Sequence, residues 1–108
     1  MSELWLPGAP AAPVDQFVER LLRTIAAFAR DAGVERPVVV VELADTARFA
    51  LDSIAPEPGF GFVTLRVHPR DDEGPDALIV PLASLRRIEL RRAAEAELRF
   101  GFALPEAQ

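Results

Sequence analysis

The chain lacks cysteine, lysine, asparagine and tyrosine, and it contains one histidine and one tryptophan. Without cysteine, disulfides, zinc–thiolate sites and thiol nucleophiles are excluded. Without lysine or tyrosine, neither residue type can serve in acid–base or Schiff-base chemistry. No apolar run approaches the roughly 20 residues of a membrane-spanning helix, and no signal peptide is recognisable at the start of the sequence. The sequence therefore predicts a protein that makes no use of a membrane, with the cytoplasm as the expected compartment.

Half of the 108 residues are apolar, which is enough for the core of one domain without disulfides or a metal. The formal net charge of −5 argues against strong non-specific nucleic-acid binding, which depends on neutralising phosphates. All twelve basic residues are arginine, and this usage, with abundant alanine and proline, suggests a bacterial source. We expect a Pro/Ala-rich tail over 1–12, a single domain over 13–105 and a short tail over 106–108.

The tail over 1–12 contains Pro7, Gly8 and Pro10, which disfavour regular structure. Its large apolar residues stand together. They are Leu4, Trp5 and Leu6. The favoured interpretation is a segment that folds back onto the domain, and the alternative is an anchor that docks on a partner.

An amphipathic helix is predicted over 14–32. Apolar residues recur there at spacings of three and four, which places them in one stripe. Pro13 suits the first helical position, Asp15 suits the positive end of the helix dipole, and Gly33 suits the stop. The stripe is formed by Val14, Val18, Leu21, Ile25, Phe28 and Ala32. A helix with so wide an apolar face must pack against the rest of the domain.

After Pro37 the hydrophobic period changes from 3.6 to 2, which is typical of strands. Tight turns are predicted at 45–46 and 82–84. The segment 56–59, with two prolines and a glycine, is expected to break or sharply bend the chain. Residues 86–98 also suit a helix by composition. A helix there would bury Glu89 and Arg92, so strands are preferred, and 91–97 is where strand and helix are hardest to separate. The predicted strands are 38–43, 48–54, 60–67, 77–80, 86–91 and 98–104.

This order of elements resembles the Sm-like fold, an SH3-like barrel that begins with a helix. Residues 39–49 look like the opening of the first Sm motif, with Thr46 in place of the usual glycine. Residues 78–90, a strand, one helical turn and a strand, are similar in shape to the second motif. A PRC-type barrel, which carries a comparable Val-Pro-Leu turn, is a rival. The expected fold is α+β: an N-terminal amphipathic helix packed on a small, strongly bent antiparallel Sm-like or SH3-like β-barrel of five to six strands.

The resemblance implies assembly, because Sm-like proteins form rings by pairing the fourth strand of one subunit with the fifth of the next. A short strand over 77–80 is an exposed edge unless it is paired. The familiar RNA site is not expected to carry over, since the chain has no asparagine, Gly61 falls near its first position, and Pro81 and Leu82 fall near its second. We therefore predict a non-catalytic assembly or interaction module, most simply a homo-oligomer, with a protein partner as a further option. The alternative is an RNA-binding Sm-like protein with a non-standard site.

Two groups of side chains are candidate binding residues. Phe60 and Phe62 flank Gly61 and would stack bases or dock a partner if exposed, although a core position is favoured. Arg86 and Arg87 begin the one basic cluster, which also contains Arg91 and Arg92. Phosphate contact is its functional interpretation. The favoured alternative is ion pairing across strands with Glu89, Glu95 and Glu97.

No constellation for catalysis or metal binding stands out. His68 would need a partner carboxylate such as Asp71 or Asp72 to act as a general base, and a surface position is favoured. The loop acids do not match an EF-hand. These acids are Asp71, Asp72, Glu73 and Asp76. Phosphate-binding loops and nucleophile elbows are also missing. The sequence predicts a protein that is not an enzyme and uses neither a cofactor nor a metal.

Overall fold

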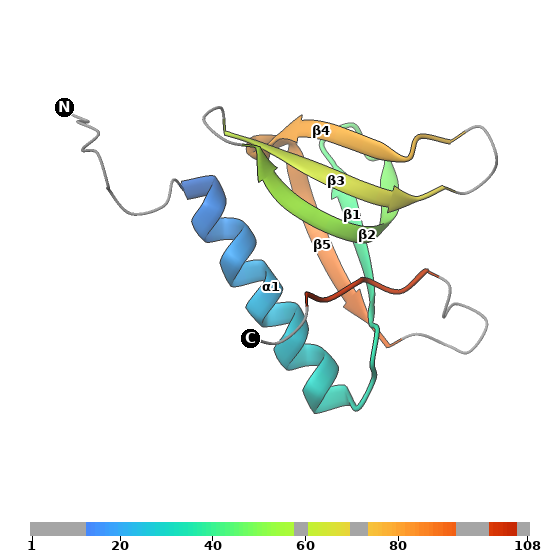
Figure 1. Ribbon diagram of the computed structural model, residues 1–108. Helices are drawn as coiled ribbons and strands as arrows, with labels where there is room; N and C mark the ends of the chain where they lie inside the picture. The colour runs from blue at the N-terminus through green and yellow to red at the C-terminus, as the bar shows by residue number, and fades with distance from the viewer. Residues whose placement is uncertain (1–12, 58–60, 70–73, 93–99, 106–108) are drawn as a thin grey trace.

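The computed structural model describes residues 13–57, 61–69, 74–92 and 100–105 (Figure 1). One helix precedes five strands that form a single antiparallel sheet in the order β4-β3-β2-β1-β5. The elements are α1 (Pro13–Ala32), β1 (Val38–Leu43), β2 (Arg48–Glu57), β3 (Phe62–His68), β4 (Ala77–Pro81), the 3₁₀ turn η1 (Leu82–Ser84) and β5 (Leu85–Arg91). The predicted α+β class is confirmed. No helix in this part of the chain has the length and apolar character needed to cross a membrane.

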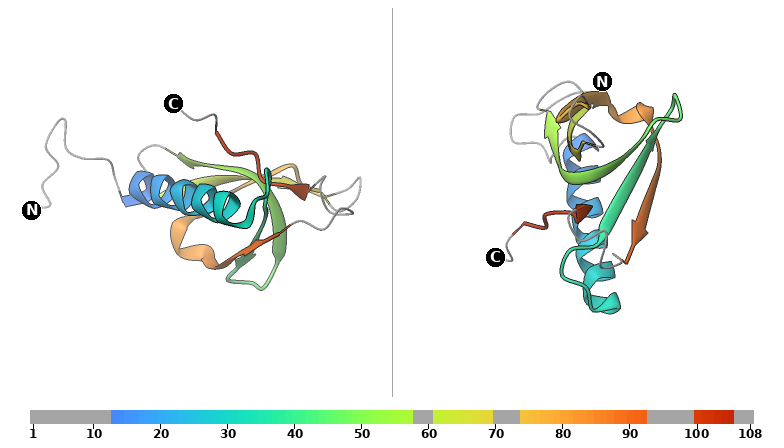
Figure 2. Two further views of the ribbon diagram at one scale, coloured as in Figure 1. Left: turned by 90° about the horizontal axis from the view of Figure 1, so that it is seen from below. Right: turned by 90° about the vertical axis from the view of Figure 1, so that its right-hand side faces the viewer.

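Helix α1 follows its predicted stripe closely. Val14, Val18, Ile25 and Ala29 are buried against the sheet, and α1 lies along one side of it (Figures 1 and 2). Gly33 takes a φ of 72°, which a residue without a Cβ adopts at little cost. The helix therefore ends where the sequence predicted.

The strands alternate between a buried and an outer face. The expected sharing of one face by Val63, Leu65 and Val67 is confirmed, because all three are buried in the core. Helix α1 packs against this face, and the opposite face bears most of the polar side chains. The buried strand residues are Val38, Val39, Val41, Leu43, Leu51, Ile54, Val63, Leu65 and Val67.

The sheet is not closed into a barrel. β4 pairs with β3 and β5 pairs with β1, so β4 and β5 are the two edges of an open sheet. The side chains of α1 join the same core cluster as the inner faces of the strands. Burial of the inner face therefore does not depend on pairing between the two edges, and the prediction of a closed barrel is corrected to a bent, open sheet (Figure 2).

Strand β2 continues through Pro56 to Glu57, so its predicted end at Ile54 is wrong. The register gives the reason. β1 pairs with β2 only at Arg48, Phe49 and Ala50, and beyond that point β3 is the strand that pairs with β2 among the described residues. Because none of the described strands pairs with the other side of this half of β2, a residue that lacks an N–H is tolerated there. Within β2 the register shifts between Leu51 and Ser53, and an irregularity of this kind bends a strand. The break predicted over 56–59 is confirmed, because β2 ends at Glu57 and the chain returns antiparallel from Phe62.

The predicted last strand is wrong over 100–104, where the structure assigns no strand, and 98–99 lie outside the described residues. The segment is held by two separate backbone bonds rather than by a ladder. The Phe102 N–H donates to Pro37 O at 2.8 Å, and the Ala103 N–H donates to Asp52 O at 2.7 Å. Phe102 is fully buried. The alternation of this segment thus reflects one aromatic anchor in the core.

Candidate functional site

Phe62 is exposed, so the favoured core position is wrong for this residue, and Phe60 lies outside the described residues. The side chain follows Gly61, whose φ of 71° turns the chain into β3. Phe62 then points to the outer face, opposite the buried Val63. It is 36% exposed, and Ile79 on β4 is 61% exposed. Among the described residues, Phe62 and Ile79 are the large hydrophobic side chains that are exposed to solvent.

Strand β4 forms an uncharged edge. Its outer-facing residues, Ala77, Ile79 and Pro81, are all exposed, and none of its five residues is ionisable. Strand β3 brings Phe62 beside Pro81 and Thr64 beside Ile79. Proteins commonly protect edge strands with charged side chains or by covering them. We call Phe62, Ile79 and Pro81, together with the free side of β4, the β4 edge patch.

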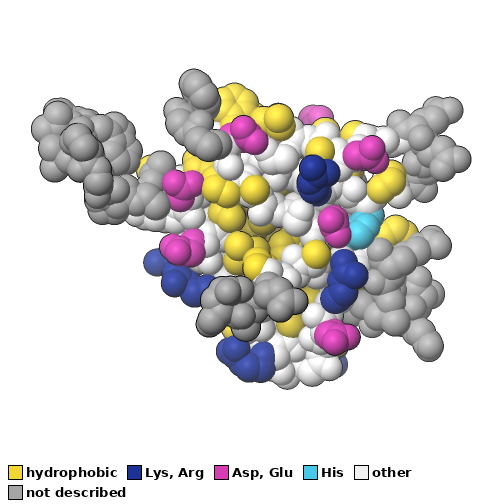
Figure 3. Space-filling view, in the orientation of Figure 1, with side chains coloured by type: hydrophobic (Ala, Val, Ile, Leu, Met, Phe, Trp, Pro, Cys, Tyr) yellow, Lys and Arg dark blue, Asp and Glu magenta, His cyan; other side chains and the backbone are white. Residues whose placement is uncertain are grey.

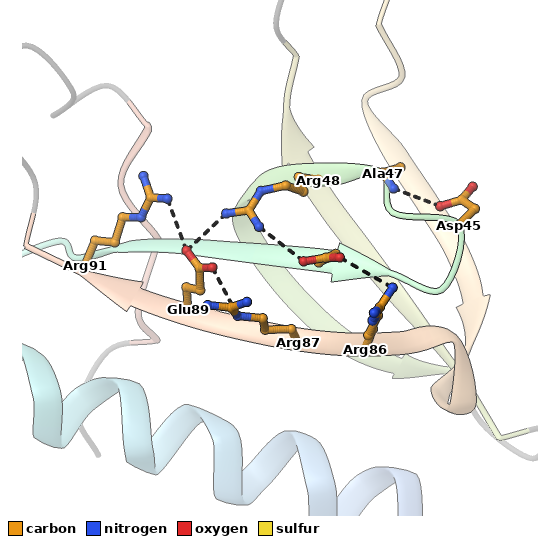
Figure 4. A network of polar contacts seen from close by, with 8 residues as sticks. Asp45, Ala47, Arg48, Arg86, Arg87, Glu89 and Arg91 are labelled. Carbon is orange, nitrogen blue, oxygen red and sulfur yellow. Dashed lines mark hydrogen bonds and ion pairs between the residues drawn. The ribbon is translucent and has the colours of Figure 1, made fainter.

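The opposite edge carries the arginines predicted as a basic cluster. Figure 4 shows them in a network on the outer face of β5, β1 and β2. Arg87 and Arg91 contact Glu89 at 3.2 and 3.1 Å, and Arg86 contacts Glu42 at 3.8 Å. Arg48 bridges both carboxylates, at 3.2 Å from Glu42 and 3.1 Å from Glu89. Ion pairing with Glu89 is confirmed for Arg87 and Arg91, but it runs along β5 and not across strands as predicted. The predicted partners at 95 and 97 lie outside the described residues.

The network also changes the ionisation of Glu89. Hydrogen bonds from Arg48 and then Arg91 lower the pKa of Glu89 below its ordinary value of 4.5. Four arginines face two glutamates, so this network carries an excess of two positive charges. Arg48 and Arg86 pair with glutamates on other strands, whereas Arg87 and Arg91 pair with Glu89 on their own strand. These ion pairs favour a structural role over direct contact with phosphate.

The structure does not bring the sequence-predicted binding residues to one place in the sheet. Phe62 lies on β3, whereas Arg86 and Arg87 lie on β5, with β2 and β1 between these strands. They mark two different surfaces of the sheet, each close to one of its edges.

A polar cluster around His68 was missed by the sequence analysis. His68 Nε2 lies 3.0 Å from Gly101 O and 3.8 Å from Asp52 Oδ1. Arg36 reaches the same two groups, at 3.0 and 3.6 Å. In Figure 3 the histidine lies among acidic and basic side chains. The partner carboxylate comes from the neighbouring strand, and the proposed partners Asp71 and Asp72 lie outside the described residues.

The His68 cluster holds the C-terminal segment in place. The His68 ring also meets the Phe100 ring edge to face, with centroids 5.9 Å apart. A shallow pocket of about 250 Å³ lies beside it on the outer face, lined by Val40, Arg48 and Arg91 among others. His68 and Arg36 both direct nitrogen atoms at a backbone carbonyl, which is the geometry of a structural clamp.

Within residues 13–57, 61–69, 74–92 and 100–105, no three histidine or acidic side chains gather as metal ligands would. Comparisons with models of protein families, with curated proteins and with solved structures gave no match for this chain.

Proposed function

We propose that the protein is a non-catalytic self-assembly module, in which β4 of one subunit pairs with β5 of the next in the manner of Sm-like proteins. The observation that carries the proposal is the uncharged edge of β4 with its exposed Ile79. An edge strand with free N–H and C=O groups and apolar side chains is a ready template for another strand.

Strand β5 is a suitable complement for β4. It is the other edge of the same sheet, so pairing the two edges between subunits would continue one sheet from copy to copy. Its outer face carries Arg87 and Arg91, whose aliphatic stems can cover an apolar neighbour while their charged ends stay in water. When one edge of a subunit is paired, its other edge is still available to the next subunit, so the assembly is heterologous. A heterologous assembly closes as a ring when the rotation between successive subunits closes, and a ring is what the resemblance to Sm-like proteins implies.

The proposal is tested by placing a charge on the edge. Ile79→Lys adds the residue that natural proteins use to block edge pairing, at a position that is exposed and outside the core. Light scattering after size exclusion should give an oligomer for the unmodified chain and a monomer for Ile79→Lys. The matched control is Thr24→Lys, which adds the same charge on the exposed side of α1 and should leave the oligomer intact. Equal masses for the unmodified chain and Ile79→Lys would refute pairing through β4.

RNA binding is the second candidate, and the excess positive charge of the arginine network is the observation that favours it. Binding of uridine-rich and adenosine-rich RNA should be measured at two salt concentrations, because phosphate contacts weaken as salt increases. With the arginines held in ion pairs, we expect no submicromolar binding. Tight, salt-sensitive binding that is lost in Arg86→Ala/Arg87→Ala would favour RNA over the assembly proposal.

A further inference from the structure

A second apolar surface begins at Leu82, the residue after Pro81 of the β4 edge patch. It is a groove of about 280 Å³ between the N-terminal half of α1 and the η1–β5 corner, and it is lined by Phe17, Leu82, Leu85, Arg86, Arg87 and Ile88. Figure 4 shows α1 running alongside β5. The four apolar lining residues are only half-buried. We call this surface the α1–β5 groove.

We propose that the α1–β5 groove is the docking site for the tail of the same chain, with Leu4, Trp5 and Leu6 as the residues that fill it. These three residues are the large apolar side chains of 1–12. The groove is slightly smaller than the roughly 300–1,000 Å³ of small-molecule pockets, and this size suits a few side chains of a peptide. A tryptophan presents about 150–250 Å² of surface for burial.

The position of the groove favours this occupant. Phe17 lies about one helical turn after Pro13, where the tail enters α1. Eight residue steps separate Trp5 from Pro13, which allows a reach of up to about 26 Å. A segment tethered by so short a linker has an effective concentration on the order of millimolar at a neighbouring site. Docking within one chain is therefore favoured over docking of the same segment from another copy.

Charge supports the same assignment. Glu3 directly precedes the apolar triplet and is the only acidic residue of the tail. Arg86 and Arg87 border the groove, and their side chains are 60% and 64% exposed. A carboxylate beside the docked triplet can approach these guanidinium groups, which carry several donors each. The prolines at 7, 10 and 13 restrict the free tail and so reduce the entropy that docking removes.

The lone tryptophan makes the proposal directly measurable. The chain has no tyrosine and no second tryptophan, so its tryptophan fluorescence reports Trp5 alone. Compared with a peptide of residues 1–12, the full chain should emit at shorter wavelength and resist quenching by acrylamide. Phe17→Ala should move both properties to the values of the peptide. Phe28→Ala is the matched control: it makes the same change on the same helix, at a half-buried position outside the groove, and should leave Trp5 unchanged.

A second variant keeps the test informative if Phe17→Ala fails to fold. Arg87→Glu alters an exposed side chain and should increase quenching of Trp5 by repelling Glu3, and Glu3→Arg in the same chain should restore protection. Emission of the full chain equal to that of the peptide, or insensitive to both Phe17→Ala and Arg87→Glu, would overturn the proposal.

Docking of the tail and assembly through β4 can be tested separately. Trp5 should stay protected in Ile79→Lys and at every protein concentration, because docking is intramolecular. Loss of protection on dilution would show that the tail binds another copy and would contradict the inference, whatever the result for β4.

Discussion

The Nε2 atom of His68 lies 3.0 Å from the carbonyl oxygen of Gly101, 33 positions later in the chain. A carbonyl oxygen only accepts hydrogen bonds, so Nε2 carries the proton in this contact. Arg36 Nη2 donates to the same oxygen, also at 3.0 Å. Gly101 is buried, and its carbonyl thus receives two donors from distant parts of the sequence.

This shared acceptor predicts non-additive stability effects. Arg36→Ala and His68→Ala should each lower the free energy of unfolding by about 1 kcal/mol, the usual net value of one hydrogen bond. The double variant leaves the buried Gly101 carbonyl without either donor, which costs about 1–3 kcal/mol more. Urea denaturation of the four proteins measures the coupling. Simple additivity would mean that the two side chains do not share this role.

Phe102 is expected to be the main anchor of the C-terminal segment. Its side chain is fully buried in the core formed by α1 and the sheet. Phe102→Ala should lower the free energy of unfolding by about 3–5 kcal/mol. Phe62→Ala makes the same change at an exposed site and should change it by only about 0.5 kcal/mol. Both are compared by urea denaturation at one protein concentration, and equal losses would refute the anchoring role.

Thr46 occupies the turn between β1 and β2 with a φ of 71°. The left-handed region costs an L-residue about 1–2 kcal/mol, and replacing Thr46 by glycine removes this cost. Glycine also makes the unfolded chain more flexible, which lowers the free energy of unfolding by about 0.5–1 kcal/mol. Thr46→Gly should therefore raise the free energy of unfolding by about 0.5–1 kcal/mol. Thr46→Ala keeps a Cβ and should bring no such gain, so equal thermal midpoints for the two variants would argue against strain.

Glu89 predicts a specific pH dependence. Its pKa is lowered, first by the hydrogen bond from Arg48, so its ionised form is favoured by folding. The stability from this group is present above pH 4.5 and is lost as the pH falls through the lower pKa of the folded protein. An NMR titration of the Glu89 carboxyl should give a midpoint below 4.5 that moves towards 4.5 in Arg48→Gln. Arg66→Gln, an exposed arginine on β3, should leave the midpoint unchanged.

The sequence predicted an element well where the pattern of apolar residues alone decides which side chains are buried. The stripe of α1 and the alternation of β1 are set by which residues face the core, and this is visible in the sequence. The turn at Asp45 and Thr46 is confirmed, and the Asp45 side chain accepts a hydrogen bond from Ala47 N at 3.0 Å. Residues such as these fold according to neighbours within a few positions.

Features that depend on long-range register were not predictable. Pro56 stays within β2 because β1 stops pairing at Ala50, and a single sequence does not reveal where a neighbouring strand ends. The partnership of His68 with Asp52 rests on the irregular register between Leu51 and Ser53. The alternation of apolar and other residues around Phe102 is the same for a strand and for an irregular segment with one buried ring. The sequence could therefore not separate these two structures.

Native mass spectrometry of the unmodified chain tests the central claim of assembly most directly. Pairing of β4 with β5 between subunits should give a discrete closed oligomer, with a mass that is a fixed multiple of 11.8 kDa, and Ile79→Lys should reduce it to a single chain. A mass of 11.8 kDa for the unmodified protein, at concentrations where Thr24→Lys and Ile79→Lys give the same value, would contradict the account.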